Sequence, residues 1–275
     1  MAYQGGPESY MLNACSSGDT STLQQLFTDH GIQPGSKPVY PKLIDPGSPQ
    51  EVLTTTMGLQ IPPTSKLLER AVAAKQVAIV KFILQMYPSF SLMQEHGIVR
   101  TVLEHPNPEI LQVLCDHERN FVNFSVDYGM RCFLTDACAR PAEEIGPVLH
   151  VLLDYGADVH DGWGAGGGAL YAVVIGGQSL EIVKRILERT GAVSRRNVSE
   201  AIWRGRVDVV ELFLNHRRFG PGVKPEEIVE DAEKSGDKEI IVVVRSWALQ
   251  AKGKGKKGLF VGYWERVRNL AKSII

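Results

Sequence analysis

Two short stretches combine residue types that could do chemistry or bind a partner. Glu104 and His105 are adjacent, and a carboxylate beside an imidazole can move a proton as general base and acid. Trp203 and Arg204 are also adjacent, and these two residue types are enriched at the energetic centres of protein interfaces. Arg140 adds a further guanidinium group. These residues therefore allow two interpretations, a small-molecule site with proton transfer or a surface that binds a protein.

The motifs that mark common cofactor and metal sites do not fit this chain. Residues 162–167, GWGAGG, satisfy G-x-G-x-x-G, but the dinucleotide fingerprint needs a strand before it, and VLHVLLDYGADVHD reads as a helix and turn. No P-loop lysine, HExxH or G-x-S-x-G follows elsewhere. The four cysteines lack zinc spacing, so we predict buried free thiols. We interpret the glycine run as a loop tip and expect no cofactor and no metal.

The elements that must position these side chains are best seen in Ala169–Ala192, ALYAVVIGGQSLEIVKRILERTGA. The pattern predicts two short helices, joined by a Gly-Gly turn and closed by Gly191. Helices below about 12–15 residues are marginal alone, so such a pair needs neighbours to bury its apolar faces.

The same plan recurs along the chain: a small residue in a first helix, a turn, and a second helix with apolar residues at helical spacing. It is found at Leu12–Phe27, Leu67–Leu84, Ile98–Leu114, Phe133–Gly162, Val198–His216 and Ile228–Trp247. From Ala71 to Ala232 the small-residue positions are 31, 35, 35, 29 and 31 residues apart. A period near 33 residues indicates a repeat protein.

The best-preserved stretch, VLHVLLDYGADVHDG followed by GGALYAVVIGGQSLEIVKRILERTGA, resembles the ankyrin repeat. Residues 156–159 match the turn that follows the second helix of that repeat, although GALY replaces its TPLH signature. The match is strongest over residues 133–216. The resemblance implies an all-α, ankyrin-type helical solenoid of about six to seven degenerate helix-turn-helix repeats with extended finger loops.

The resemblance also implies where a site would lie, because the last residues before each inter-helix turn face the concave groove of ankyrin-type stacks. In the middle of this chain those positions hold Glu104, His105, Arg140, Trp203 and Arg204. The fingers would add Asp127, Tyr128, Arg131 and Trp163.

We predict that the solenoid spans residues 1–251. Two segments depart from its repeat pattern, one inside the solenoid and one after it. Residues 31–65 hold seven of the 15 prolines, and we predict an insertion loop with one helical turn near Gln50–Thr54. Residues 252–275 read as a basic Gly/Lys linker and an amphipathic helix. That helix would either cap the last repeat by packing on Ile240–Val244 or lie on an acidic membrane surface.

Charge and the N-terminal sequence bear on partners and location. Residues 252–275 hold seven of the 30 Lys and Arg residues and one of the 31 acids, which leaves a charge near −7 on residues 1–251 and +6 on the tail. An acidic body gives no reason to expect nucleic-acid binding. MAYQGGPESY does not read as a secretory leader, so we expect a cytoplasmic protein, with a nuclear one as the alternative.

Two functions remain open. The first is an intracellular ankyrin-repeat binding protein that recognises a protein partner through its concave groove and fingers. The alternative is a divergent ankyrin-fold enzyme, a cofactor-independent isomerase or cyclase, in which Glu104 or His105 transfers a proton on a small molecule held in the groove. A deep, enclosed pocket at these two residues would favour the enzyme, and an open groove would favour the binding protein.

Overall fold

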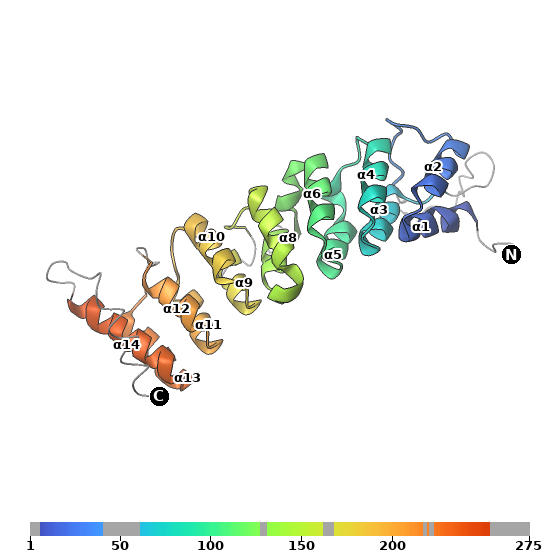
Figure 1. The fold of residues 1–275 in the computed structure, drawn as a ribbon. Helices are drawn as coiled ribbons and strands as arrows, with labels where there is room; N and C mark the ends of the chain where they lie inside the picture. The colour runs from blue at the N-terminus through green and yellow to red at the C-terminus, as the bar shows by residue number, and fades with distance from the viewer. Residues whose placement is uncertain are drawn as a thin grey trace, which may run out of the picture. The chain divides into compact units, whose positions relative to one another are not determined.

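The computed structural model describes residues 6–40, 61–126, 131–161, 168–216, 219 and 223–253. Over these residues the chain forms fourteen α-helices, two short 3₁₀ helices and one two-stranded hairpin (Figure 1). It divides into two compact units, one of Met1–Ala137 with Glu143–Asp158 and one of Cys138–Ala142 with Val159–Ile275. The prediction of a mainly helical chain is therefore confirmed for the described residues.

The first unit contains three consecutive helix pairs followed by a hairpin and two more helices. The pairs are α1 (Pro7–Ser17) with α2 (Thr20–Asp29), α3 (Thr64–Ala73) with α4 (Val77–Met86), and α5 (His96–Glu104) with α6 (Pro108–His117). A short 3₁₀ helix, η1 (Leu92–Gln94), lies between α4 and α5. The elements after α6 are η2 (Arg119–Asn123), β1 (Ser125–Val126), β2 (Arg131–Cys132), α7 (Phe133–Cys138) and α8 (Ala142–Asp154). Cys138, the last residue of α7, belongs to the second unit.

The second unit contains the remaining three pairs. They are α9 (Gly168–Ile175) with α10 (Leu180–Thr190), α11 (Arg195–Trp203) with α12 (Val207–Leu214), and α13 (Pro225–Ser235) with α14 (Lys238–Gly253). Six of the seven predicted helix-turn-helix stretches thus match these six pairs, and the seventh, Phe133–Gly162, holds α7 and α8.

Within each unit, the first helices of successive pairs contact one another, and so do the second helices. In the first unit α3 packs between α1 and α5, and α4 contacts both α2 and α6. In the second unit α11 packs between α9 and α13, and α12 contacts both α10 and α14. The small-residue positions are all buried: Ala14, Ala71, Val102, Ala137, Ala172, Ala201 and Ala232. A small side chain there lets two helix backbones approach closely.

The turn between the two helices of a pair uses the same backbone conformation in both units. Gly18 and Gly177 have φ values of 76° and 65°, in the left-handed region that glycine adopts without strain. Lys75 occupies the equivalent position between α3 and α4 with φ 57°, and it is the one described residue other than glycine with a positive φ. The fold therefore imposes the glycine conformation on a lysine at this turn.

The described ends of the proline-rich insertion are joined to each other and to the first unit. The Val39 nitrogen donates to Thr64 Oγ1 over 3.0 Å, and the Thr64 nitrogen donates to the Val39 carbonyl oxygen over 2.8 Å. The ring of Tyr40 stacks on Phe90 with centroids 6.1 Å apart. Helix α3 begins at Thr64, so the insertion ends slightly earlier than predicted. The helical turn expected near Gln50–Thr54 lies outside the described residues.

The hairpin of β1 and β2 is antiparallel and pairs Ser125 with Cys132. It lies between α6 and α7. None of the described helices is long and apolar enough to cross a membrane. Helix α14 continues to Gly253, so Lys252 and Gly253, predicted to begin the basic linker, are helical instead. The amphipathic helix predicted from Leu259 lies outside the described residues.

Candidate functional site

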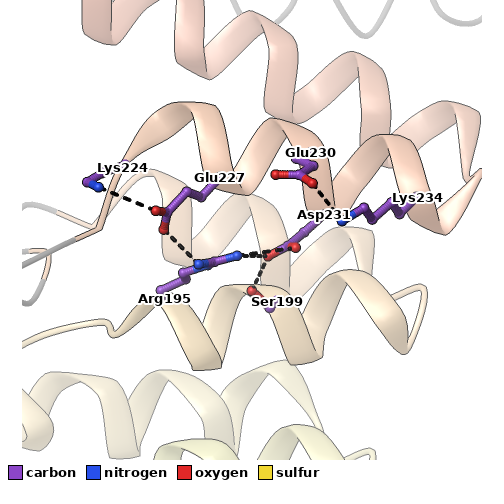
Figure 2. Close-up of polar contacts among 7 residues, drawn as sticks. All are labelled: Arg195, Ser199, Lys224, Glu227, Glu230, Asp231 and Lys234. Atoms are coloured by element: carbon purple, nitrogen blue, oxygen red, sulfur yellow. Dashed lines mark hydrogen bonds and ion pairs between the residues drawn. The ribbon is translucent and has the colours of Figure 1, made fainter.

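Helices α11 and α13 are fastened together by a charged network, which fixes the surface that α11 presents. Figure 2 shows Arg195 reaching from α11 to two carboxylates of α13. Its Nη1 lies 2.7 Å from Glu227 Oε2, and its Nη2 lies 3.4 Å from Asp231 Oδ2. Ser199 also donates to Asp231 Oδ2, over 2.5 Å. Asp231 is only 9% exposed, and these two partners supply hydrogen bonds to its buried carboxylate.

A second chain of contacts organises the neighbouring face of α11. The Tyr171 hydroxyl of α9 donates to Glu200 Oε2 over 3.1 Å, and Arg204 Nε donates to Glu200 Oε1 over 3.0 Å. The guanidinium carbon of Arg196 lies 4.3 Å from the centre of the Tyr171 ring, a cation–π distance. One carboxylate therefore holds a tyrosine and an arginine, while a second arginine covers the tyrosine ring.

Trp203 lies beside this chain of contacts as the last residue of α11. It is 55% exposed, whereas Ala201 and Ile202 before it are buried. The Arg204 side chain is 49% exposed, although its Nε is held by Glu200. We call Tyr171, Arg196, Glu200, Trp203 and Arg204 the Trp203 surface. It offers a large aromatic face beside guanidinium groups that are held in place, so little side-chain freedom is lost on binding.

Glu104 and His105 lie in the first unit, at the end of α5, and both are exposed. They line an open hollow of about 400 Å³ on the first helices of the three pairs. Its other described lining residues are Leu12, Lys66, Glu69, Arg70, Ala73 and Thr101. Glu104 lies 4.0 Å from Arg100, one turn earlier on the same helix. Two acids and three basic side chains thus face one shallow space.

Glu69 is the most perturbed acid of this hollow. Burial raises the pKa of its carboxyl above the usual 4.5, and the charges of Arg100 and Lys66 oppose that rise. Burial also raises the pKa of nearby Glu95, where a hydrogen bond with Ser65 lowers it and the charge of Glu69 raises it further. The two carboxyls therefore disfavour each other's ionised forms.

Arg140 follows α7 and belongs to the second unit. Its backbone carbonyl group contacts the turn that follows α9. Gln178 Nε2 donates to the Arg140 carbonyl oxygen over 2.6 Å and to that of Cys138 over 3.2 Å. A Cβ on Gly176 would meet both carbonyl oxygens. The turn after α9 therefore packs directly on the turn after α7.

The other predicted site residues lie in loops that the structure covers only in part. Asp127, Tyr128 and Trp163 lie outside the described residues. Arg131 is placed through its backbone as the first residue of β2. Among the predicted site residues, Glu104 and His105 thus lie in the first unit, and Arg140, Trp203 and Arg204 lie in the second.

Several residues of the Trp203 surface and of the hollow at Glu104 were not predicted from the sequence. Glu200 and Arg204 are four residues apart on α11, so helical spacing alone could have indicated that contact. Tyr171 comes from a different helix pair, and no spacing rule joins it to Glu200. Glu69 lies a full turn before the position expected to face the groove, which is why it was missed.

The described residues contain no group of three or more His, Cys, Asp or Glu that could hold a metal ion. All four cysteines are buried thiols that form no disulfide, as predicted. Burial raises the pKa of Cys15 and of Cys115 to about 12, so neither thiol is an activated nucleophile. No protein-family model matches the chain, and no curated protein matches its sequence.

Proposed function

We propose that this chain is an ankyrin-type repeat protein that binds a protein partner through the Trp203 surface. The repeat assignment is supported by the contacts within each unit, where α11 packs between α9 and α13 and α12 between α10 and α14. It is also supported by the recurring left-handed turn at Gly18, Lys75 and Gly177. These features are what stacked repeats of one helix-turn-helix unit require.

The observation that carries the binding proposal is Trp203, a 55% exposed tryptophan at the end of a helix whose neighbouring polar groups are already paired. A tryptophan and an arginine at one place are the usual anchors of a protein interface. Arg204 uses its Nε for Glu200, which leaves its two terminal nitrogens as donors for a partner. A partner segment that pairs a carboxylate with an apolar side chain fits this arrangement.

The alternative, an enzyme that uses Glu104 or His105 for proton transfer, has less support. Both side chains are exposed at an open hollow, and an isomerase or cyclase of the predicted kind excludes water from its reacting groups. The acid with a raised pKa in that hollow is Glu69. If this hollow has an activity, Glu69 is the better candidate for its general acid.

A random-peptide display library selected on the full chain tests the binding proposal. We expect the selected peptides to combine Asp or Glu with an aromatic or aliphatic residue, and to lose binding to the Trp203→Ala variant. Lys184→Ala is a suitable control, because this exposed lysine lies on α10, on the second helix of its pair. Peptides that bind the Trp203→Ala variant as well as the unchanged protein would contradict the proposal.

A further inference from the structure

The outer face of the α13–α14 pair carries an apolar hollow at the end of the described chain. The hollow measures about 220 Å³, and Val229, Arg245, Ala248 and Leu249 line it. Leu249 is 73% exposed and Val242, two turns earlier on α14, is 42% exposed. Single exposed apolar residues are common, but two on one helical stripe beside a hollow form a surface that another element can cover.

The surface of α14 that is open to another element differs from the capping surface predicted from the sequence. The sequence pattern suggested that the tail packs on Ile240–Val244, but Ile240 and Val244 are fully buried. Helix α14 contacts both α12 and α13, which accounts for that burial. The exposed stripe of Val242, Arg245 and Leu249 is therefore the part of α14 that a further element would contact.

Two acidic residues share a face of α13 with Val229, which lines this hollow. Glu226 and Glu233 lie three residues before and four residues after Val229, so all three share one face of α13. Arg245 Nη2 lies 2.8 Å from Glu233 Oε1, which fixes the register of the two antiparallel helices. In that register the C-terminal end of α14 runs towards the Glu226 end of α13.

The segment that follows α14 matches this surface in both polarity and charge. Residues 259–275 carry apolar side chains at helical spacing: Phe260, Tyr263, Trp264, Val267, Leu270, Ala271 and Ile274. Residues 252–275 hold seven Lys and Arg against one acid. An apolar stripe with basic flanks is complementary to a hollow that is apolar apart from Arg245, itself paired with Glu233, and that lies beside a face of α13 carrying two glutamates.

The lengths also agree. Helix α14 has 16 residues, or about 24 Å of helix, and residues 259–275 would form a helix of about 25 Å. Residues 254–258, with their alternating glycines and lysines, can span up to about 17 Å when extended. That distance is sufficient for the chain to reverse at Gly253 and return along α14.

From these observations we infer that residues 259–275 fold back as an amphipathic helix and dock in the hollow of Val229, Ala248 and Leu249. Trp264 and Val267 would enter the apolar hollow, while the basic residues of the tail would lie beside Glu226 and Glu233. This docking does not depend on the Trp203 surface or on any partner.

Amide hydrogen exchange on the full-length chain tests the docking. The Trp264→Asp/Val267→Asp variant places two charges on the apolar stripe. The Asn269→Asp/Ser273→Asp variant adds the same two charges on the opposite face of the same helix and is the matched control. We expect peptides from residues 226–233 and 241–251 to exchange at least about tenfold faster in the first variant and unchanged in the control. Unchanged exchange in residues 195–203 would show that the second unit remains folded.

Three results would overturn the inference. Equal exchange in the unchanged protein and in the Trp264→Asp/Val267→Asp variant would show that the tail does not cover the hollow. Protection that increases with protein concentration would assign the hollow to a second copy of the chain. Protection that appears only with vesicles containing an anionic phospholipid would assign the tail to a membrane surface.

Discussion

The hydroxyl of Tyr171 donates to Glu200 Oε2 over 3.1 Å and thereby joins α9 to the face of α11 that ends in Trp203. Glu200 in turn holds Arg204, and Arg196 lies over the Tyr171 ring. The position of the two exposed arginines therefore depends on one tyrosine of the preceding helix pair. Substitutions of Tyr171 can distinguish the contribution of its hydrogen bond to Glu200 from that of its ring contact with Arg196.

Tyr171→Phe should lower the free energy of unfolding by about 1 kcal/mol or less, because it removes one half-buried hydrogen bond and keeps the ring under Arg196. Tyr171→Ala should cost more, because the cation–π contact and the ring packing are lost as well. Urea unfolding of both variants measures the difference. Equal losses would mean that the ring contact with Arg196 contributes nothing.

Lys75→Gly should stabilise the first unit by about 1 kcal/mol, since Lys75 adopts φ 57° at the turn position where two other pairs have Gly18 and Gly177. Lys75→Ala is the control, because alanine removes the long side chain but keeps the unfavourable conformation. Thermal and urea unfolding should therefore rank the glycine variant above both others. Stabilisation by alanine to the same extent would show that the lysine side chain, not the backbone, is the source of the effect.

Gly176→Ala should destabilise the chain by about 1–3 kcal/mol, because the new Cβ would meet the carbonyl oxygens of Cys138 and Arg140. Gly146→Ala, in α8, is the matched control because a Cβ there meets no atom within 4 Å. The control should be stabilised by up to about 1 kcal/mol through the better helix propensity of alanine. Equal effects of the two substitutions would contradict the close approach at Gly176.

Glu69→Gln should raise the melting temperature at about pH 7 and leave it unchanged at about pH 3. The pKa of Glu69 is raised by burial above its usual 4.5, so ionisation of this group costs stability in the folded state. That cost is absent below the usual pKa and grows as the pH rises through the folded value. Melting curves of both proteins across this range test the sign. A variant that is less stable at about pH 7 would show that the ionised carboxylate is stabilising.

The helix pairs were predictable because their signal is local and repeated. The buried residues at the repeat positions, such as Ala71 and Ala172, mark each pair in the sequence, and turn glycines such as Gly18 and Gly177 mark several of them. Asp19 shows the same for capping, since it accepts the Thr22 backbone N–H over 2.9 Å at the start of α2, as its place in the turn predicts. Even the left-handed Lys75 could be found by alignment with Gly18.

The candidate site was only partly predictable, because its contacts join different helix pairs. Trp203 and Arg204 could be chosen from their place before a turn. The role of Tyr171 depends on how α9 packs on α11, and the role of Glu69 depends on how α3 packs on α5. Side-chain direction at such contacts is decided by packing in three dimensions, for which residue spacing along one helix gives no rule.

The central claim is that the Trp203 surface binds a protein segment, and titration calorimetry with a peptide selected on the full chain tests it most directly. Trp203→Ala and Arg204→Ala should each weaken binding by about thirtyfold, equivalent to about 2 kcal/mol. Lys184→Ala, and unchanged melting temperatures of all variants, serve as controls. Equal affinity of the Trp203→Ala variant and the unchanged protein for that peptide would contradict the account.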